Sequence, residues 1–134
     1  LVSEWPRGSR EWLEEIWPAR LTAVLPADHS LNASLRPGGG VAVRMPCSTA
    51  IREIIACVGA PLISTSANKS GMPPMRRMSE IRKAFPGLAA YITKKGRQST
   101  LPSTVMDLRE RPFKVLRPGA FDPGPATDRE GKRR

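Results

Sequence analysis

A run of hydroxyl and amide side chains follows the apolar residues 61–63 in the stretch PLISTSANKSGMPP. The run consists of Ser64, Thr65, Ser66 and Asn68. These side chains compete with the backbone for hydrogen bonds, so one interpretation is a turn or a helix N-cap. The other interpretation is the rim of a pocket, where short donors and acceptors converge on a bound polar molecule. The stretch therefore predicts either local capping or a ligand site.

Three more clusters place basic or polar side chains next to segments that read as strands. They are VAVR with Arg44, PSTV with Ser103 and VLRPG with Arg117. Fixed guanidinium groups combined with several hydroxyls suit an anionic ligand that accepts many hydrogen bonds. Arg44 and Arg117 could instead be ordinary surface arginines at strand ends. The four clusters together favour binding of an anionic ligand.

Familiar catalytic constellations do not occur in this sequence. His29 is the only histidine, and Cys47 and Cys57 are the only cysteines, without a CxxC spacing. Neither a zinc site, a disulfide framework nor a triad built on histidine is indicated. A GxxxxGK[ST] phosphate loop is also missing, and the glycines at 38–40 alone are weak evidence of one.

The net charge of +10 resides in the body of the chain. Residues 21–121 contain 15 basic and 5 acidic side chains, whereas the two ends nearly balance. A basic globular body attracts polyanions such as nucleic acid or nucleotide phosphates, although a merely soluble basic surface is the alternative. No apolar run approaches the roughly 20 residues of a membrane helix, and no signal peptide is visible. We expect a cytoplasmic protein.

The apolar spacing predicts the elements that would position these clusters. The sequence predicts a helix over 10–17 capped by Ser9, strands over 21–25 and 41–44, a helix from Ser48 to Gly59 and a strand over 62–65. The strand–helix–strand order over 41–65 is typical of a parallel pair with a right-handed crossover. Ligands collect beyond the carboxyl ends of such strands, where Arg44 and the polar run would both lie.

The second half of the chain contains fewer clear signals. A helix capped by Ser79 is expected through Phe85, followed by a strand over 88–92 and a turn over 94–97. Residues 105–108 and 113–116 flank a proline break and predict a hairpin. We expect one domain over residues 1–120 and a disordered tail over 121–134, because the tail is rich in proline, glycine and charge.

Five motifs in this order resemble those of the YrdC-like threonylcarbamoyl-AMP synthases. They are WPARLTAVLPA, VAVRMP, PLISTSANKSGMPP, LPSTVMDL and VLRPGA, and they cover roughly residues 17 to 120. The combination of STSANxSG, PSTVxDL and LRPG is much more specific than any one of them. The resemblance implies an α/β fold, with a YrdC-like twisted mixed sheet and flanking helices.

The resemblance also implies an activity and its site residues. Members of this family make threonylcarbamoyl-adenylate from L-threonine, bicarbonate and ATP and release pyrophosphate, and the product serves tRNA modification. Mg²⁺ on the triphosphate is expected. By motif, the resemblance assigns ATP binding to Ser66, Asn68 and Arg117, and it assigns threonine binding to Arg44, Ser64 and Ser103.

The chain also departs from the family pattern. The segment resembling PTDTVYGL and the following KxR motif do not occur, so we expect an N-terminally truncated fragment, and WPARLT replaces the usual WPGPLT. A basic domain without a complete active site suggests an alternative, a double-stranded RNA- or tRNA-binding protein. A carbamoyl-transfer module related to hydrogenase maturation ranks last, because its acylphosphatase-like and zinc-finger segments do not occur here.

Overall fold

The computed structural model describes residues 1–91 and 101–124 of the 134-residue chain. The chain forms two compact units. The first unit comprises Leu1–Val58 and Ser99–Arg134, and the second comprises Gly59–Gln98.

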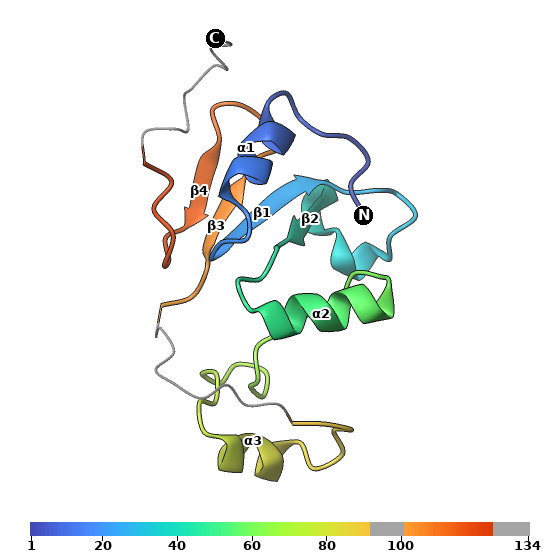
Figure 1. Ribbon diagram of the computed structural model, residues 1–134, viewed down its shortest axis with the longest axis vertical. Coiled ribbons are helices and arrows are strands. Elements are labelled where there is room, and N and C mark those ends of the chain that lie inside the picture. The colour runs from blue at the N-terminus through green and yellow to red at the C-terminus, as the bar shows by residue number, and fades with distance from the viewer. Residues whose placement is uncertain (92–100, 125–134) are drawn as a thin grey trace. The chain divides into compact units, whose positions relative to one another are not determined.

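The first unit contains a four-stranded mixed sheet (Figure 1). Its strands are β1 (Leu21–Pro26), β2 (Gly40–Val43), β3 (Thr104–Asp107) and β4 (Lys114–Arg117), in the spatial order β2-β1-β3-β4. β1 pairs antiparallel with β2 and parallel with β3, and β3 pairs antiparallel with β4. The predicted α/β fold with a mixed sheet and flanking helices is confirmed, and so is the predicted hairpin of β3 and β4.

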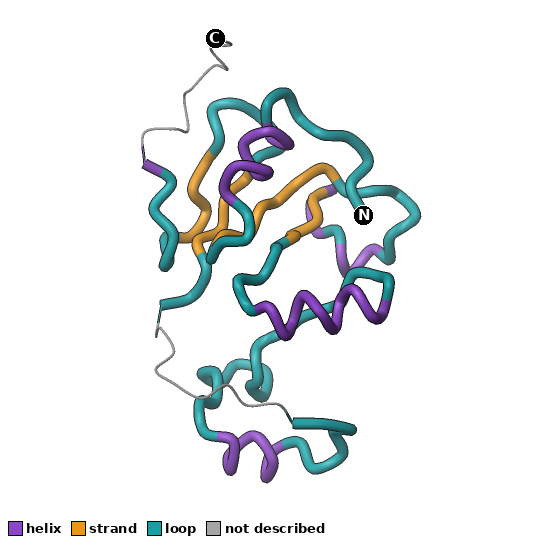
Figure 2. Tube along the Cα trace, viewed as in Figure 1, coloured by secondary structure: helices purple, strands orange, loops and turns teal. Residues whose placement is uncertain are grey.

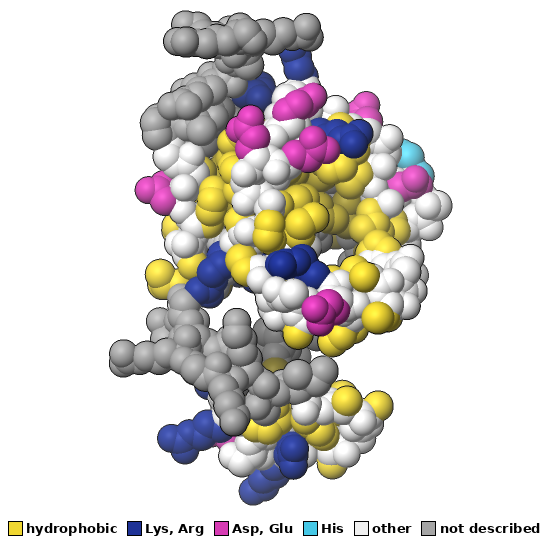
Figure 3. Space-filling view, viewed as in Figure 1, with side chains coloured by type: hydrophobic (Ala, Val, Ile, Leu, Met, Phe, Trp, Pro, Cys, Tyr) yellow, Lys and Arg dark blue, Asp and Glu magenta, His cyan; other side chains and the backbone are white. Residues whose placement is uncertain are grey.

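Helix α1 (Ser9–Ile16) covers one face of this sheet (Figure 1). The alternating burial of β1 places Leu21, Ala23 and Leu25 on the covered face, as the two-residue period of a strand requires. They pack with Leu13 of α1 and with Met106, Leu108 and Phe113. The outer side of α1 is acidic, with exposed Glu11, Glu14 and Glu15 (Figure 3).

The N-terminal end of α1 differs from the prediction in one detail. Ser9 is the first helical residue and is fully buried, and the N-cap is Gly8, whose φ of 71° is accessible to glycine without strain. The Ser9 hydroxyl donates a hydrogen bond to the carbonyl oxygen of Pro6, 2.6 Å away. The predicted capping role of Ser9 is therefore wrong, because its hydroxyl fixes the preceding turn instead.

The connection from β1 to β2 contains two short 3₁₀ turns, Ala33–Leu35 and Pro37–Gly39. After β2 the chain enters α2 (Thr49–Val58), which confirms the helix predicted over this segment. All residues of α2 are at least partly exposed, including Ile51, Ile54 and Val58 of its apolar face.

The predicted parallel strand–helix–strand unit is wrong. β2 is antiparallel to its neighbour β1, and residues 62–65 form no strand in the structure. Ile63, an apolar residue of the predicted strand, is 79% exposed. The strand that pairs in parallel with β1 is β3, about 80 residues further along the chain.

The second unit consists mainly of loops and the helix α3 (Met78–Ala84), as Figure 2 shows. This helix confirms the one predicted over 79–85, although Arg77 rather than Ser79 is its N-cap. Residues 88–91 form no strand, contrary to the prediction for 88–92. Residue 92, the turn predicted over 94–97 and residues 125–134 of the predicted tail lie outside the described residues. Across the described residues, the helices are too short or too polar to cross a membrane.

Candidate functional site

Strand direction gathers polar side chains from four strands at one edge of the sheet. β2 and β4 run opposite to β1 and β3, so they end where β1 and β3 begin. Arg44 directly follows β2, Arg117 ends β4, and Ser103 directly precedes β3. Thr22 lies near the start of β1. We call Thr22, Arg44, Ser103 and Arg117 the polar edge.

Direct hydrogen bonds join three members of the polar edge. The Ser103 hydroxyl lies 3.0 Å from the Thr22 hydroxyl. The Arg117 guanidinium donates from Nη2 to the Ser103 carbonyl oxygen at 2.9 Å and reaches the Ser103 hydroxyl at 3.5 Å. Buried and half-buried side chains alternate along β1 and β3, and the buried ones face α1. Thr22 and Ser103 are half-buried, so they lie on the sheet face opposite α1. The three side chains are therefore outside the core and open to a ligand.

The LRPG segment is held closely against the start of β3. The Ala120 amide donates to the Pro102 carbonyl at 2.9 Å, and the Phe121 amide donates to the Thr104 hydroxyl at 3.1 Å. A Cβ atom on Gly119 would lie 2.5 Å from backbone atoms of residues 102–104. Only glycine permits this approach, which places Arg117 beside Ser103.

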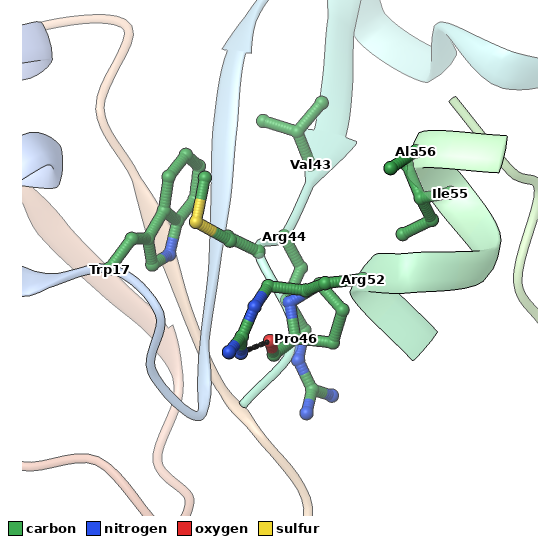
Figure 4. Close-up of a pocket in the computed structure, with 8 residues that line it drawn as sticks. Trp17, Val43, Arg44, Pro46, Arg52, Ile55 and Ala56 are labelled. Carbon is green, nitrogen blue, oxygen red and sulfur yellow. Dashed lines mark hydrogen bonds between the residues drawn. The ribbon is translucent and has the colours of Figure 1, made fainter. Parts of the chain in front are cut away.

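Arg44 lines a hollow of about 360 Å³ at the carboxyl end of β2 (Figure 4). The other lining residues are Trp17, Val43, Met45, Pro46, Arg52, Ile55 and Ala56. Arg52 of α2 donates to the Pro46 carbonyl oxygen at 2.8 Å and to the Thr49 hydroxyl at 3.3 Å. An apolar hollow with guanidinium groups at its border suits a small anion that has an apolar portion.

The arginines of the polar edge form no ion pair among the described residues. The two ion pairs that the structure describes, Arg10 with Glu14 and Arg109 with Asp107, involve none of its members. Asp107 lies at the far end of β3, where hydrogen bonds from Arg109 hold the pKa of its carboxyl below the ordinary value. The charges of Arg44 and Arg117 are thus available to an anionic ligand.

The remaining predicted site residues belong to the second unit. The Asn68 amide nitrogen donates to the carbonyl oxygens of Lys69 (3.0 Å) and Met72 (2.9 Å), and its amide oxygen accepts a hydrogen bond from the Ser66 hydroxyl. Asn68 has a negative φ, so it does not serve as a left-handed turn residue. Both side chains close their own loop, and Ser64 is exposed. Their roles in binding ATP and threonine stay predictions.

The structure places two further residues at the site, Thr22 and Arg52, which no motif in the sequence marked as candidates. Thr22 had a recognisable signal, because it is the one hydroxyl side chain in the apolar strand LTAVL. Arg52 had none, since an arginine on an amphipathic helix is ordinarily a solvated surface residue. Its contact with Pro46 depends on how α2 lies against the turn after β2.

The chain is similar in sequence to proteins of a known family. The Sua5/YciO/YrdC family model, described as "Telomere recombination", matches residues 1–119. A Mycobacterium tuberculosis relative is 34% identical over 121 residues, which are 89% of this chain and 55% of that protein. The threonylcarbamoyl-AMP synthase of Pyrococcus abyssi is 33% identical over 123 residues, which are 90% of this chain and 36% of that enzyme. The chain thus spans from about a third to about half of these curated relatives.

Solved structures agree with the sequence comparison. The crystal structure of P. abyssi Sua5 complexed with L-threonine has a TM-score of 0.75 at 33% identity, covering 89% of this chain and 36% of that one. Escherichia coli YciO has a TM-score of 0.74 at 21% identity, covering 90% of this chain and 60% of that one. The second likeness concerns the fold alone.

Proposed function

This chain belongs to the Sua5/YciO/YrdC family, and we propose that it performs threonylcarbamoyl-AMP synthesis. The substrates would be L-threonine, bicarbonate and ATP, and the products threonylcarbamoyl-AMP and pyrophosphate. The L-threonine bound by the P. abyssi relative supports threonine as a substrate. The product would serve tRNA modification in the cytoplasm.

The contact of Arg117 with Ser103 is the observation that carries this proposal. Arg117 belongs to the motif expected to bind ATP, Ser103 belongs to the motif expected to bind threonine, and a 2.9 Å hydrogen bond joins them. The final step is attack of a carbamate carboxylate on the α-phosphate of ATP. Such a displacement depends on holding two anions close together and neutralising their charge. Adjacent subsites with guanidinium groups meet this requirement.

The role of Arg44 follows from the same chemistry. Its guanidinium, at the border of an apolar hollow, would bind the carboxylate of L-threonine while the hollow receives the methyl group. A hydroxyl from Ser103 would complete the binding of the polar groups. None of these side chains needs to act as a nucleophile, since the substrate carbamate supplies the attacking oxygen.

Mg²⁺ would enter this site with the nucleotide. The described residues contain no group of three His, Cys, Asp or Glu side chains that could hold a metal ion. Guanidinium and hydroxyl donors at the polar edge are also poorly suited as ligands for a hard cation, which prefers oxygen anions. The phosphate oxygens of ATP are such ligands, so we treat Mg²⁺ as a part of the substrate.

Pyrophosphate release tests the proposal. The chain would be incubated with ATP, Mg²⁺ and bicarbonate, with and without L-threonine, alongside the variants Ser103→Ala and Arg117→Ala. We expect release that depends on threonine and is strongly reduced in both variants. Release without threonine dependence would contradict the proposed reaction. If no release occurs, calorimetric titration with L-threonine and with ATP measures whether either subsite binds its substrate.

RNA binding is a second candidate, favoured by one feature of the second unit. Arg76, Arg77, Arg82 and Lys83 are exposed on and beside α3, with Glu80 as the acidic residue among them (Figure 3). Binding to phosphates should weaken steeply as the salt concentration rises, because counterions are released. Affinity for a double-stranded RNA and for a tRNA, measured between low and physiological salt, tests this candidate. Affinity that is absent, or that does not change with salt, would exclude binding to phosphates.

A further inference from the structure

We propose that Thr22 is a positioning residue that orients the Ser103 hydroxyl for substrate binding, an inference that rests on the proposed function. Thr22 belongs to the WPARLT motif, to which no role was assigned. Its Oγ1 atom lies 3.0 Å from the Ser103 Oγ atom, although 81 residues separate the two in sequence. The strand pairing of β1 with β3 creates this contact.

The two hydroxyls differ in how firmly the chain holds them. Thr22 lies in β1, which pairs with a strand on each side, and a β-branched side chain has few rotamers in a strand. Ser103 lies just before β3 in the chain, outside the ladder, and a serine hydroxyl rotates freely unless a partner fixes it. The rigid residue is therefore Thr22, and Ser103 is the residue that needs orienting.

The hydroxyls of Thr22 and Ser103 together can donate one hydrogen bond to a ligand. Two hydroxyls contain two hydrogens, and their mutual hydrogen bond uses one of them, whichever residue donates it. The second hydrogen has no partner among the described residues and can be donated to an anionic oxygen. Arg117 donates to the Ser103 carbonyl from the other side, at 2.9 Å. The pair and the guanidinium thus present their donors next to one another.

Position on the sheet supports a role in binding rather than in packing. Thr22 and Ser103 are both half-buried on the face opposite α1, outside the core. The core side chains of β1 are Leu21, Ala23 and Leu25, and removing the Thr22 hydroxyl changes none of their contacts. Valine has nearly the same shape as threonine, so Thr22→Val removes the hydrogen bond and leaves the strand intact.

The test is a double-mutant cycle that measures L-threonine affinity by calorimetry. Thr22→Val should weaken L-threonine binding by about fivefold, the effect of losing one neutral hydrogen bond. Thr22→Ser, which keeps a hydroxyl, should restore affinity to within about twofold of the unaltered chain. In a Ser103→Ala background, Thr22→Val should have almost no further effect, because Thr22 acts through Ser103.

Controls separate positioning from general destabilisation. Ser34→Ala removes a comparable exposed hydroxyl bond, 2.9 Å to Asn32, in the connection between β1 and β2, and should leave L-threonine affinity unchanged. The thermal unfolding midpoint and the ATP affinity of Thr22→Val should also match those of the unaltered chain. Equal weakening of ATP and L-threonine binding, accompanied by a lower midpoint, would mean a structural role and overturn the inference.

Two further outcomes distinguish the inference from the proposed function. If the unaltered chain binds L-threonine and the Thr22→Val variant binds it equally well, the inference is wrong and the proposed function stands. The same conclusion holds if Thr22→Val lowers the affinity as much in the Ser103→Ala background as it does alone. If the unaltered chain binds neither L-threonine nor ATP, the proposed function fails for this chain and the inference fails with it.

Discussion

Arg52 holds the carbonyl oxygen of Pro46 through a 2.8 Å hydrogen bond, and this contact ties α2 to the turn that follows β2. Pro46 lies two residues after Arg44, so the contact restrains the backbone that directly follows Arg44 (Figure 4). The Arg52 guanidinium also donates to the Thr49 hydroxyl at 3.3 Å, in the first turn of α2. The planar fork of an arginine presents a separate nitrogen to each acceptor, Nη1 to Pro46 and Nη2 to Thr49, whereas a lysine has a single nitrogen.

We therefore expect Arg52→Lys to reduce L-threonine affinity several-fold, because Arg44 is held less firmly. The unfolding midpoint should fall by only a few degrees, since Arg52 is half-buried and outside the core. Calorimetry and thermal unfolding measure the two effects. Arg10→Lys, on the exposed side of α1, is the matched control and should change neither. Unchanged threonine affinity in Arg52→Lys would disprove the role of this contact.

Gly119→Ala should destabilise the first unit by about 2 kcal/mol, the cost of forcing an extra carbon into a packed backbone. The new Cβ atom would lie 2.5 Å from backbone atoms of residues 102–104, which cannot move as a flexible side chain could. Urea unfolding measures the loss. Gly87→Ala is the control, because a Cβ atom there meets nothing within 4 Å. Similar stability of the two variants would contradict the close approach.

Leu25→Ala and Ile63→Ala compare two apolar residues that the sequence assigns alike to strands. Leu25 is fully buried, so its truncation should cost about 3 kcal/mol through lost burial and a residual cavity. Ile63 is 79% exposed, and its truncation should cost less than about 0.5 kcal/mol. Urea unfolding of both variants measures the difference. A large loss in Ile63→Ala would mean that residues 62–65 are buried in solution.

Asp107→Asn should lower stability at neutral pH by about 1 kcal/mol, because it removes charge-assisted hydrogen bonds from a partly exposed Arg109. These bonds hold the pKa of Asp107 below its ordinary value in the folded chain. A carboxyl with a lowered folded pKa contributes stability above its unfolded pKa and loses it as the pH falls through the folded pKa. The difference between the two proteins should therefore shrink below about pH 4.

Thermal unfolding between pH 7 and pH 2.5 measures this dependence, with Glu53→Gln on α2 as a control for removing an exposed carboxylate. A stability difference that stays constant over this range would show that the ion pair with Arg109 is not its source.

Local patterns predicted several elements well. The apolar spacing over residues 10–17 predicted the helix α1, and that over residues 48–59 predicted α2, because one face of a helix repeats every three to four residues. The proline break between the two apolar runs gave the hairpin of β3 and β4. The motif order also predicted the family. All of these signals are contained in short stretches of chain.

Pairing between distant segments could not be predicted in this way. The apolar run at 61–63 has the composition of a buried strand, but whether it pairs depends on which segments lie beside it. β1 instead takes β3 as its parallel neighbour, and neither strand contains a local signal for the other. The predicted position of residues 64–68 beyond a parallel strand pair is therefore wrong, although Arg44 does lie at the carboxyl end of its strand. The binding roles of Ser64, Ser66 and Asn68 stay predictions.

The sequence by itself determined the residue types of the candidate site, namely arginines and hydroxyls at the ends of strands. Only the tertiary structure decided which of them meet. Antiparallel pairing of β2 and β4 with their neighbours brings Arg44 and Arg117 to the edge where Thr22 and Ser103 lie. Strand direction is a property of paired segments, fixed by hydrogen bonds and burial that act across 80 or so residues, so no single stretch of the chain encodes it.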